Sequence, residues 1–160
     1  MIVVSDTSVV SGLFQIGHLS LLRSLHGHVL IPSKVFDELT RMVDFKNWFD
    51  QEQPTWIEVR AISDYSRFIN LTQDLDEGES EAITLCLELH ADLLLMDELE
   101  GRAMAVKWGI PIIGVLGLLI EAKTKRLIPA VNPVMNQLLA ETTFRIAPAL
   151  YQNVLCLSGE

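Results

Sequence analysis

Four acidic residues stand where their carboxylates could share a divalent cation. Asp6 follows a β-branched apolar run, Asp97 follows a second apolar run, and Glu38 and Glu79 lie on segments with helical periodicity. Carboxylates that converge on one crevice repel each other unless a cation lies among them. Mg²⁺ and Mn²⁺ are hard cations that take carboxylate oxygens and retain several waters. The four residues therefore predict a site for one or two Mg²⁺ or Mn²⁺ ions.

Asp6 and Asp97 share one local pattern, an apolar strand that stops at a carboxylate. In open parallel sheets the ligand crevice lies at the carboxyl ends of the strands. The two carboxylates would come close together if their strands are neighbours. Each residue could also cap the helix that follows it, and for Asp97 the residue Glu100 would take the capping-box position. The two roles are compatible, because one oxygen can cap while the other binds a cation.

Helical phase separates Glu38 from its neighbour Asp37. In the helix expected over Ser33–Val43, which Ser33 can cap, one face carries an apolar stripe of Val35, Leu39 and Met42. Glu38 borders this stripe, whereas Asp37 falls on the outer face, where it can pair with Arg41. Glu38 is therefore the candidate ligand, and Asp37 is expected at the surface.

Helical phase also divides the acidic segment Asp76–Glu81. Asp76 and Glu79 fit a variant of the capping box at the start of a helix over Gly78–His90. Glu79 extends a stripe of core residues into the first helical turn, whereas Glu81 is expected to face outward. Glu79 is therefore the favoured ligand of this segment.

Further ligands stay open at this point. Glu98 is a candidate, and Glu100 and Glu81 are alternatives that the sequence does not decide between. Glu98 can instead pair with Arg102, four residues later on the same helix.

Three other motifs carry weaker signals. His26 and His28 flank a single glycine, but no third ligand has suitable spacing. Gly114–Gly117 lacks the further glycines or the lysine of a phosphate-binding loop. A small basic patch is expected to complement a helix dipole, with contact to RNA as the alternative; it comprises Lys123, Lys125 and Arg126.

Strands and helices are expected to alternate, which favours an α/β fold with a central parallel sheet and helices on its faces. Strands are expected at Ile2–Ser5, Val29–Ile31, Trp56–Ala61, Asp92–Met96 and Ile110–Ile113. Besides those given above, helices are expected at Thr7–Ile16, His18–Leu25, Asp64–Thr72, Glu98–Trp108 and Val115–Lys125. The segment Phe45–Gln53 is either a helical turn or a surface that faces a partner. Residues 1–160 are expected to form one domain, with 132–160 as a helical extension that packs on it.

Composition limits the function classes. Apolar residues make up 49% of the 160 residues and charged residues 21%, so the chain is globular rather than disordered. Twelve Lys and Arg against 21 Asp and Glu give a net charge of −9, which argues against broad, nonspecific adhesion to nucleic acid. A nuclease is still compatible, since bound cations and a local basic rim can supply positive charge.

The chain is expected to be cytoplasmic and free of membrane spans. Its start lacks a secretory signal, and the longest uncharged stretch, Trp108–Ile120, is too short to cross a bilayer. The two cysteines, Cys86 and Cys156, show no CxxC spacing, and Cys86 is expected in the core.

The ordered set Asp6-Thr7-Ser8, Glu38, Glu79 and Asp97 resembles the PIN-domain family over roughly the whole chain. Three local stretches resemble a prokaryotic PIN subfamily of VapC-like toxin nucleases. They are 75–83 (LDEGESEAI), 93–98 (LLLMDE) with 101–103 (GRA), and 114–123 (GVLGLLIEAK). Two residues depart from the pattern of toxin-type members: the third acid is Glu79 rather than Asp, and Met96 stands where many members have Thr or Ser.

The resemblance implies a three-layer α/β/α fold with a parallel sheet of four to five strands and an acidic crevice at the strand ends. It also implies metal-dependent cleavage of RNA by Asp6, Glu38, Glu79 and Asp97, inhibition by a cognate antitoxin protein, and a homodimer. Two other readings compete. One is a phosphatase with Asp6 as nucleophile, which lacks its second Asp because Ser8 stands there. The other is a catalytically weak PIN-fold module that binds RNA or a protein partner.

Overall fold

The computed structural model describes residues 1–160 and contains one five-stranded sheet in the order β3-β2-β1-β4-β5. The strands are β1 (Val3–Ser5), β2 (Val29–Pro32), β3 (Ile57–Arg60), β4 (Leu93–Leu95) and β5 (Ile112–Ile113). All neighbouring strands are parallel. The predicted parallel sheet of four to five strands is confirmed, with β1 at its centre.

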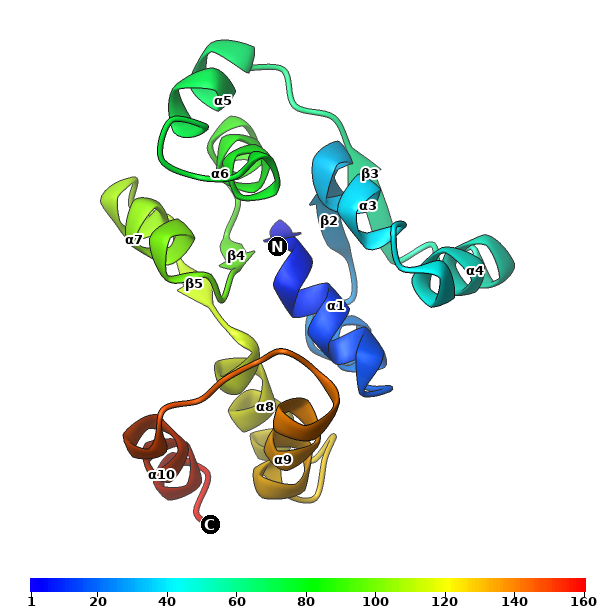
Figure 1. The fold of residues 1–160 in the computed structure, drawn as a ribbon, viewed down its shortest axis with the longest axis vertical. Coiled ribbons are helices and arrows are strands. Elements are labelled where there is room, and N and C mark those ends of the chain that lie inside the picture. The colour runs from blue at the N-terminus through cyan, green and yellow to red at the C-terminus, as the bar shows by residue number, and fades with distance from the viewer.

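Ten helices connect and cover these strands (Figure 1). They are α1 (Thr7–Gln15), α2 (Ser20–His26), α3 (Ser33–Leu39), α4 (Val43–Glu52), α5 (Tyr65–Leu71), α6 (Glu77–Leu89), α7 (Leu99–Lys107), α8 (Val115–Thr124), α9 (Val131–Glu141) and α10 (Pro148–Leu157). None of them has the length and apolar content that a bilayer crossing requires.

The three layers follow from the alternation of side chains along β1. Val3 joins a core shared with α1, α2, α3, α8 and α9, whereas Val4 joins a second core shared with α5, α6 and α7. Since successive strand residues point to opposite faces, two apolar residues in a row bury both faces of the central strand. The three-layer α/β/α arrangement is therefore confirmed.

The helix predicted over Ser33–Val43 is shorter than expected. It ends at Leu39, where the Thr40 hydroxyl donates to the carbonyl oxygens of Phe36 (2.9 Å) and Asp37 (3.1 Å). The Phe36 carbonyl also accepts from the Thr40 amide (2.9 Å), so the hydroxyl adds a partner for the Asp37 carbonyl at the end of the helix.

The segment predicted as a helical turn or partner surface is the helix α4. Its aromatic side chains pack on α1 and α3: the rings of Phe14 and Phe45 lie 5.2 Å apart, and those of Phe36 and Phe49 lie 4.9 Å apart. Aromatic pairs at these separations stabilise a fold beyond the area that they bury. Phe45 and Phe49 therefore serve packing within this chain.

At the C-terminal end, α8, α9 and α10 lie together below the sheet in Figure 1. The Glu160 carboxylate joins all three, because it accepts hydrogen bonds from the amides of Val131 (2.8 Å) and Asn132 (3.0 Å) and from Lys123 Nζ (3.0 Å). Lys123 thus links the C-terminal helices, whereas Lys125 pairs with Glu121 of the same helix at 3.0 Å.

Candidate functional site

Asp6 lies at the carboxyl end of the central strand. Its backbone N–H donates to the carbonyl oxygen of Leu95 on β4 (3.0 Å), which extends the ladder past β1 by one residue. The side chain is only 3% exposed and makes no capping bond to α1, so the predicted capping role of Asp6 is wrong. The carboxylate is therefore held at the carboxyl end of β1 beside the Thr7 amide, without the bonds to later amides of α1 that a helix cap would make.

Burial raises the pKa of Asp6 to about 8. The Thr7 amide opposes this rise, and repulsion from Glu79, Asp76 and Glu38 adds to it. Loss of hydration disfavours a carboxylate in a buried site, and nearby like charges disfavour it further. A perturbed acid at the end of a central strand is a candidate for a functional site.

Glu38 reaches the same crevice from α3. Its Oε2 accepts a hydrogen bond from Thr7 Oγ1 (2.6 Å), which joins α3 to the first turn of α1. The other carboxylate oxygen, Oε1, lies against Gly78 on α6, where an added Cβ would stand 2.6 Å from it. Only glycine leaves room for the Glu38 carboxylate at this approach.

Glu79 reaches the crevice from the first turn of α6. Its amide donates to Asp76 Oδ1 (2.8 Å), so the predicted cap by Asp76 is confirmed. The Glu79 side chain is 7% exposed, and burial followed by repulsion from Asp76 raises its pKa to about 7. Asp6, Glu38 and Glu79 thus lie at one edge of the sheet, where the charges of Glu79 and Glu38 act on Asp6.

Asp97 lies at the same edge of the sheet but turns toward α8. β1 and β4 are neighbours, with Ser5 beside Leu95. Asp97 Oδ1 accepts from the amide of Val115 (3.0 Å), the first residue of α8. Asp97 therefore caps α8, and the prediction that it caps the helix directly after it is wrong.

The second oxygen of Asp97, Oδ2, is buried without a hydrogen-bond partner. Burial raises the pKa of Asp97 to about 6, opposed by the Val115 amide and by the positive charge of Arg102. Arg102 itself donates to the carbonyl of Met96 (2.9 Å) and not to Glu98, with which it was expected to pair. Asp97 Oδ2 is thus a free acceptor at the edge of the crevice.

The expectation that Glu81 faces outward is wrong. Its side chain is 5% exposed, and its Oε1 accepts from the amide of Lys34 (3.0 Å) in the first turn of α3. Glu81 supplies the cap that was expected from Ser33, which makes no such bond. Helix α6 is buried on nearly every side, because it packs on α3, α5, α7 and the sheet. Periodicity therefore could not identify an outer face.

The remaining candidate acids lie at the margin. Glu98 and Glu100 are exposed, and both raise the pKa of Glu79 through repulsion. Asp37 is exposed as predicted, and Cys86 is buried in the core, where burial raises the pKa of its thiol to about 12.

The donor set suits a divalent cation in its chemistry. Carboxylate oxygens are the ligands that Mg²⁺ and Mn²⁺ prefer, and Asp97 Oδ2 is a buried oxygen without a partner. The side chains are not gathered, however: no three of the acidic, histidine or cysteine residues are grouped so that they could hold an ion. Glu38 is tied to Thr7, and Asp97 is tied to α8. Shared coordination would require these side chains to move closer together.

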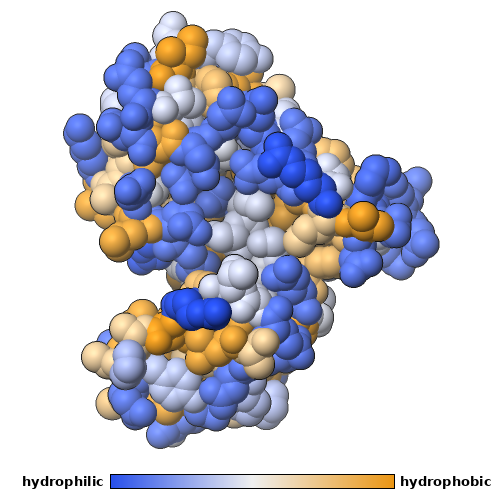
Figure 2. Space-filling view, viewed as in Figure 1, coloured by the Kyte–Doolittle hydropathy of each residue, from blue (hydrophilic) through white to orange (hydrophobic).

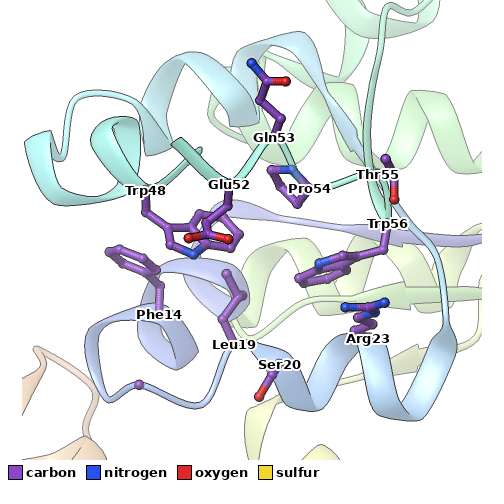
Figure 3. Close-up of a pocket in the computed structure, with 11 residues that line it drawn as sticks. Phe14, Leu19, Ser20, Arg23, Trp48, Glu52, Gln53, Pro54, Thr55 and Trp56 are labelled. Carbon is purple, nitrogen blue, oxygen red and sulfur yellow. The ribbon is translucent and has the colours of Figure 1, made fainter. Parts of the chain in front are cut away.

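The largest cavity lies far from these acids. It measures about 620 Å³ and is lined by residues at the end of α1, the start of α2, the end of α4 and the approach to β3, near the amino ends of the strands. Figure 3 shows Phe14, Trp48 and Trp56 around it, with Glu52 near Trp48 and Arg23 near Trp56. The sequence did not predict this cavity, because its aromatic residues come from three separate elements. The cavity is therefore not part of any site that the four acids form.

Comparison with known proteins agrees with this architecture. A protein-family model described as a PIN domain matches residues 2–160. No curated protein and no solved structure matches the chain. With a central parallel sheet, acidic residues at the carboxyl ends of its strands and a family match over residues 2–160, the chain belongs to the PIN-domain family.

Proposed function

We propose that this protein is a metal-dependent ribonuclease that hydrolyses RNA phosphodiester bonds. PIN domains are generally nucleases, and this chain is a PIN domain. The observation that carries the proposal is the buried carboxylate of Asp6, which faces Glu38 and Glu79 at the end of the central strand. Nothing in the packing of this chain pairs Asp6 with a cation, so its burial supports a role in binding one.

In the proposed mechanism Asp6, Glu38, Glu79 and Asp97 hold one or two Mg²⁺ or Mn²⁺ ions, with Glu98 as a further candidate. Such ions supply an activated water and neutralise charge on a phosphodiester during in-line displacement. Thr7 orients Glu38, and the Val115 amide orients Asp97. Asp6 and Glu79, whose pKa values are raised to about 8 and about 7, need to lose their protons before they can bind a cation.

Cleavage of a mixed RNA pool in Mn²⁺ tests the proposal. We expect the wild-type chain to cleave, and Asp6→Asn to lose activity at least about 100-fold while it keeps its fold, as judged by circular dichroism. Asp37→Asn is the matched control: it removes the same charge from an exposed residue next to Glu38 and should leave cleavage unchanged. Full cleavage by Asp6→Asn, or by the wild-type chain in excess EDTA, contradicts the assignment.

We further propose that the protein is the toxin of a toxin–antitoxin pair, acts in the cytoplasm, forms a homodimer and is inhibited by a cognate antitoxin. Support comes from the three stretches that resemble VapC-like toxins and from two unpaired cysteines. Induced expression should arrest growth in the wild type but not in Asp6→Asn, and light scattering gives the oligomeric state. Normal growth with the wild type at equal protein level contradicts the toxin role.

A second candidate function is a PIN-fold module that binds RNA or a protein without cleaving. The observation in its favour is that the acids are not gathered into a group that could hold an ion. Thermal unfolding with Mn²⁺ separates the two functions, because a ligand of the folded state raises the melting temperature. Stabilisation of the wild type but not of Asp6→Asn supports the nuclease, and equal melting temperatures support the binding module.

A further inference from the structure

A second cavity is lined by two of the candidate acids, Asp97 and Glu98. It measures about 270 Å³ and is bounded by α1 and by the connection between α9 and α10, which Figure 1 shows as an extended strap. Four of its lining residues carry hydroxyl groups, and we call it the hydroxyl cavity; its lining includes Ser8, Ser11, Thr142, Thr143, Asp97 and Arg145. In Figure 2 near-white, weakly polar residues lie where the upper part of the molecule meets the C-terminal helices below it. The cavity thus places hydroxyl groups beside Asp97 and Glu98.

Two buried polar atoms at the hydroxyl cavity have no partner within the chain. They are Ser8 Oγ and Asp97 Oδ2. Buried polar atoms are nearly always hydrogen-bonded, because an unpaired one carries the cost of lost hydration. These two atoms are therefore available to a ligand or to water.

Arg145 is the only basic residue that lines this cavity, and it forms no ion pair. Its Nη1 donates to the carbonyl oxygens of Phe144 (2.8 Å) and Thr142 (3.4 Å), which holds the guanidinium in place. The charges of two other cations near the acids are already partnered: Lys34 pairs with Glu77 at 3.3 Å, and the charge of Arg102 acts on Asp97. Arg145 therefore keeps donors free beside an acidic crevice.

We propose that the hydroxyl cavity binds one sugar–phosphate unit of single-stranded RNA next to the scissile bond, with Arg145 as the phosphate-binding residue. This inference rests on the proposed nuclease function. It names a residue that binds the RNA strand, which the metal-binding acids alone do not provide. An anionic strand approaching a protein of net charge −9 needs a local cation, and Arg145 supplies one. The cavity is smaller than sites for drug-sized ligands, which suits one unit of a longer strand.

The hydroxyl groups of the cavity favour RNA over DNA. The Ser11 and Thr142 hydroxyls already donate to the carbonyl oxygens of Ser8 (3.3 Å) and Leu138 (2.6 Å), so they can only accept from a ligand. Ser8 Oγ has no partner, so it can both donate to a ribose 2′-OH and accept from it. No Trp or Tyr lines the cavity, and Phe144 is its one aromatic residue. Recognition through sugar and phosphate carries little base specificity. We expect a DNA strand of the same sequence to bind about tenfold more weakly.

The test uses Asp6→Asn, which binds without cleaving, and a labelled RNA of about ten nucleotides. Arg145→Gln keeps a donor for the Thr142 and Phe144 carbonyls but removes the charge, and it should weaken binding about tenfold. Losing one phosphate contact should also flatten the slope of log affinity against log salt by about 0.7. Arg145→Lys should restore much of the affinity. The matched control is Arg23→Gln, an exposed arginine at the distant aromatic cavity, which should bind like the parent.

The same substitutions are then placed in the otherwise wild-type chain for cleavage in Mn²⁺. We expect Arg145→Gln to raise KM about tenfold with little change in kcat, since the residue contacts the bound strand and not the reacting atoms. Cleavage by the wild type with an unchanged KM in Arg145→Gln overturns the cavity assignment and leaves the nuclease standing. Faster cleavage by Arg145→Gln also overturns it, because Arg145 would then block the acids.

Failure of the nuclease itself gives a different pattern. If the wild type does not cleave but RNA affinity still depends on Arg145, the cavity assignment holds and the nuclease does not. If RNA neither binds nor is cleaved, both are overturned.

Discussion

At the scale of single residues, the site depends on how closely side chains and backbone approach. Glu38 owes its position to two contacts, the hydroxyl of Thr7 and the bare backbone of Gly78. Helical phase predicted that Glu38 borders the core, and it does. Nothing in the local sequence revealed that a glycine 40 positions away makes room for its carboxylate, because that contact depends on the packing of α3 against α6.

Gly78→Ala is therefore expected to damage the site more than the fold. The new Cβ would stand 2.6 Å from Glu38 Oε1, so the flexible carboxylate must move and its bond to Thr7 is lost. Alanine is a better helix former by about 1 kcal/mol, which offsets part of the clash. RNA cleavage should fall at least about tenfold, with a change in unfolding free energy within about 1 kcal/mol by urea titration. Asp37→Asn is again the control, since it changes an exposed residue next to Glu38, and it should cleave normally.

A second prediction concerns pH and Asp6. Its pKa is about 8 in the fold against 3.8 for an ordinary aspartic acid, so the fold prefers the protonated form. The stability that protonated Asp6 contributes to the fold is fully present below about pH 4 and is lost as the pH rises through about 8. In EDTA, Asp6→Asn should be more stable than the wild type by up to about 4 kcal/mol at pH 7, and equal to it near pH 4. Urea unfolding at both pH values measures the difference. Equal stability at pH 7 would show that Asp6 ionises freely.

At the scale of elements, two helix caps come from distant parts of the chain. Asp97 caps α8 rather than α7, and Glu81 caps α3 from within α6. The sequence favoured local caps because an acid just before a helix usually bonds its own first turn. In this fold the strand ends and helix starts crowd one edge of the sheet, so an acid can reach the start of a neighbouring helix instead.

Glu81→Ala should therefore destabilise the fold without removing metal binding. The Lys34 amide loses its acceptor in a part-buried position, which costs about 1–2 kcal/mol by urea unfolding. The rise in melting temperature with Mn²⁺ should remain as large as in the wild type. A lost Mn²⁺ response would instead make Glu81 a ligand.

Much of the architecture at this scale was predictable. The five strands and most helices follow from apolar runs and turn residues, and the pairing of β1 with β4 brings Asp6 and Asp97 to one edge. The order of strands was not predictable from local pattern, since it depends on which helices cover which face. The aromatic cavity and the hydroxyl cavity were missed for the same reason: each draws its lining from separate segments.

At the scale of the whole molecule, one carboxylate holds the C-terminal helices together. Glu160 accepts from the amides that begin α9, from Lys123 on α8 and from the Ser158 hydroxyl that follows α10. Hydrogen bonds to the Val131 amide first, and to its other donors, lower the pKa of Glu160 to about 2. This arrangement positions the strap that carries Arg145.

Glu160→Gln tests this arrangement through pH. Because the pKa of Glu160 is depressed below its ordinary value of 4.5, the ionised side chain stabilises the fold at pH values above 4.5. This contribution is lost as the pH falls toward 2. The variant should have a lower melting temperature than the wild type at pH 7, with the gap closing as both approach pH 2. A difference in melting temperature that stays constant across this pH range would mean that Glu160 stabilises the fold through its packing and not through its charge.

The central place of β1 also sets the order in which the site can assemble. Val3 and Ser5 are synthesised well before their partners on β4, which are Leu93 and Leu95. The carboxylates of Asp6 and Asp97 cannot meet at one edge until most of the chain has emerged. A nascent chain that ends before β4 carries Asp6, Glu38 and Glu79 without Asp97, so the proposed nuclease site is incomplete until β4 has paired with β1.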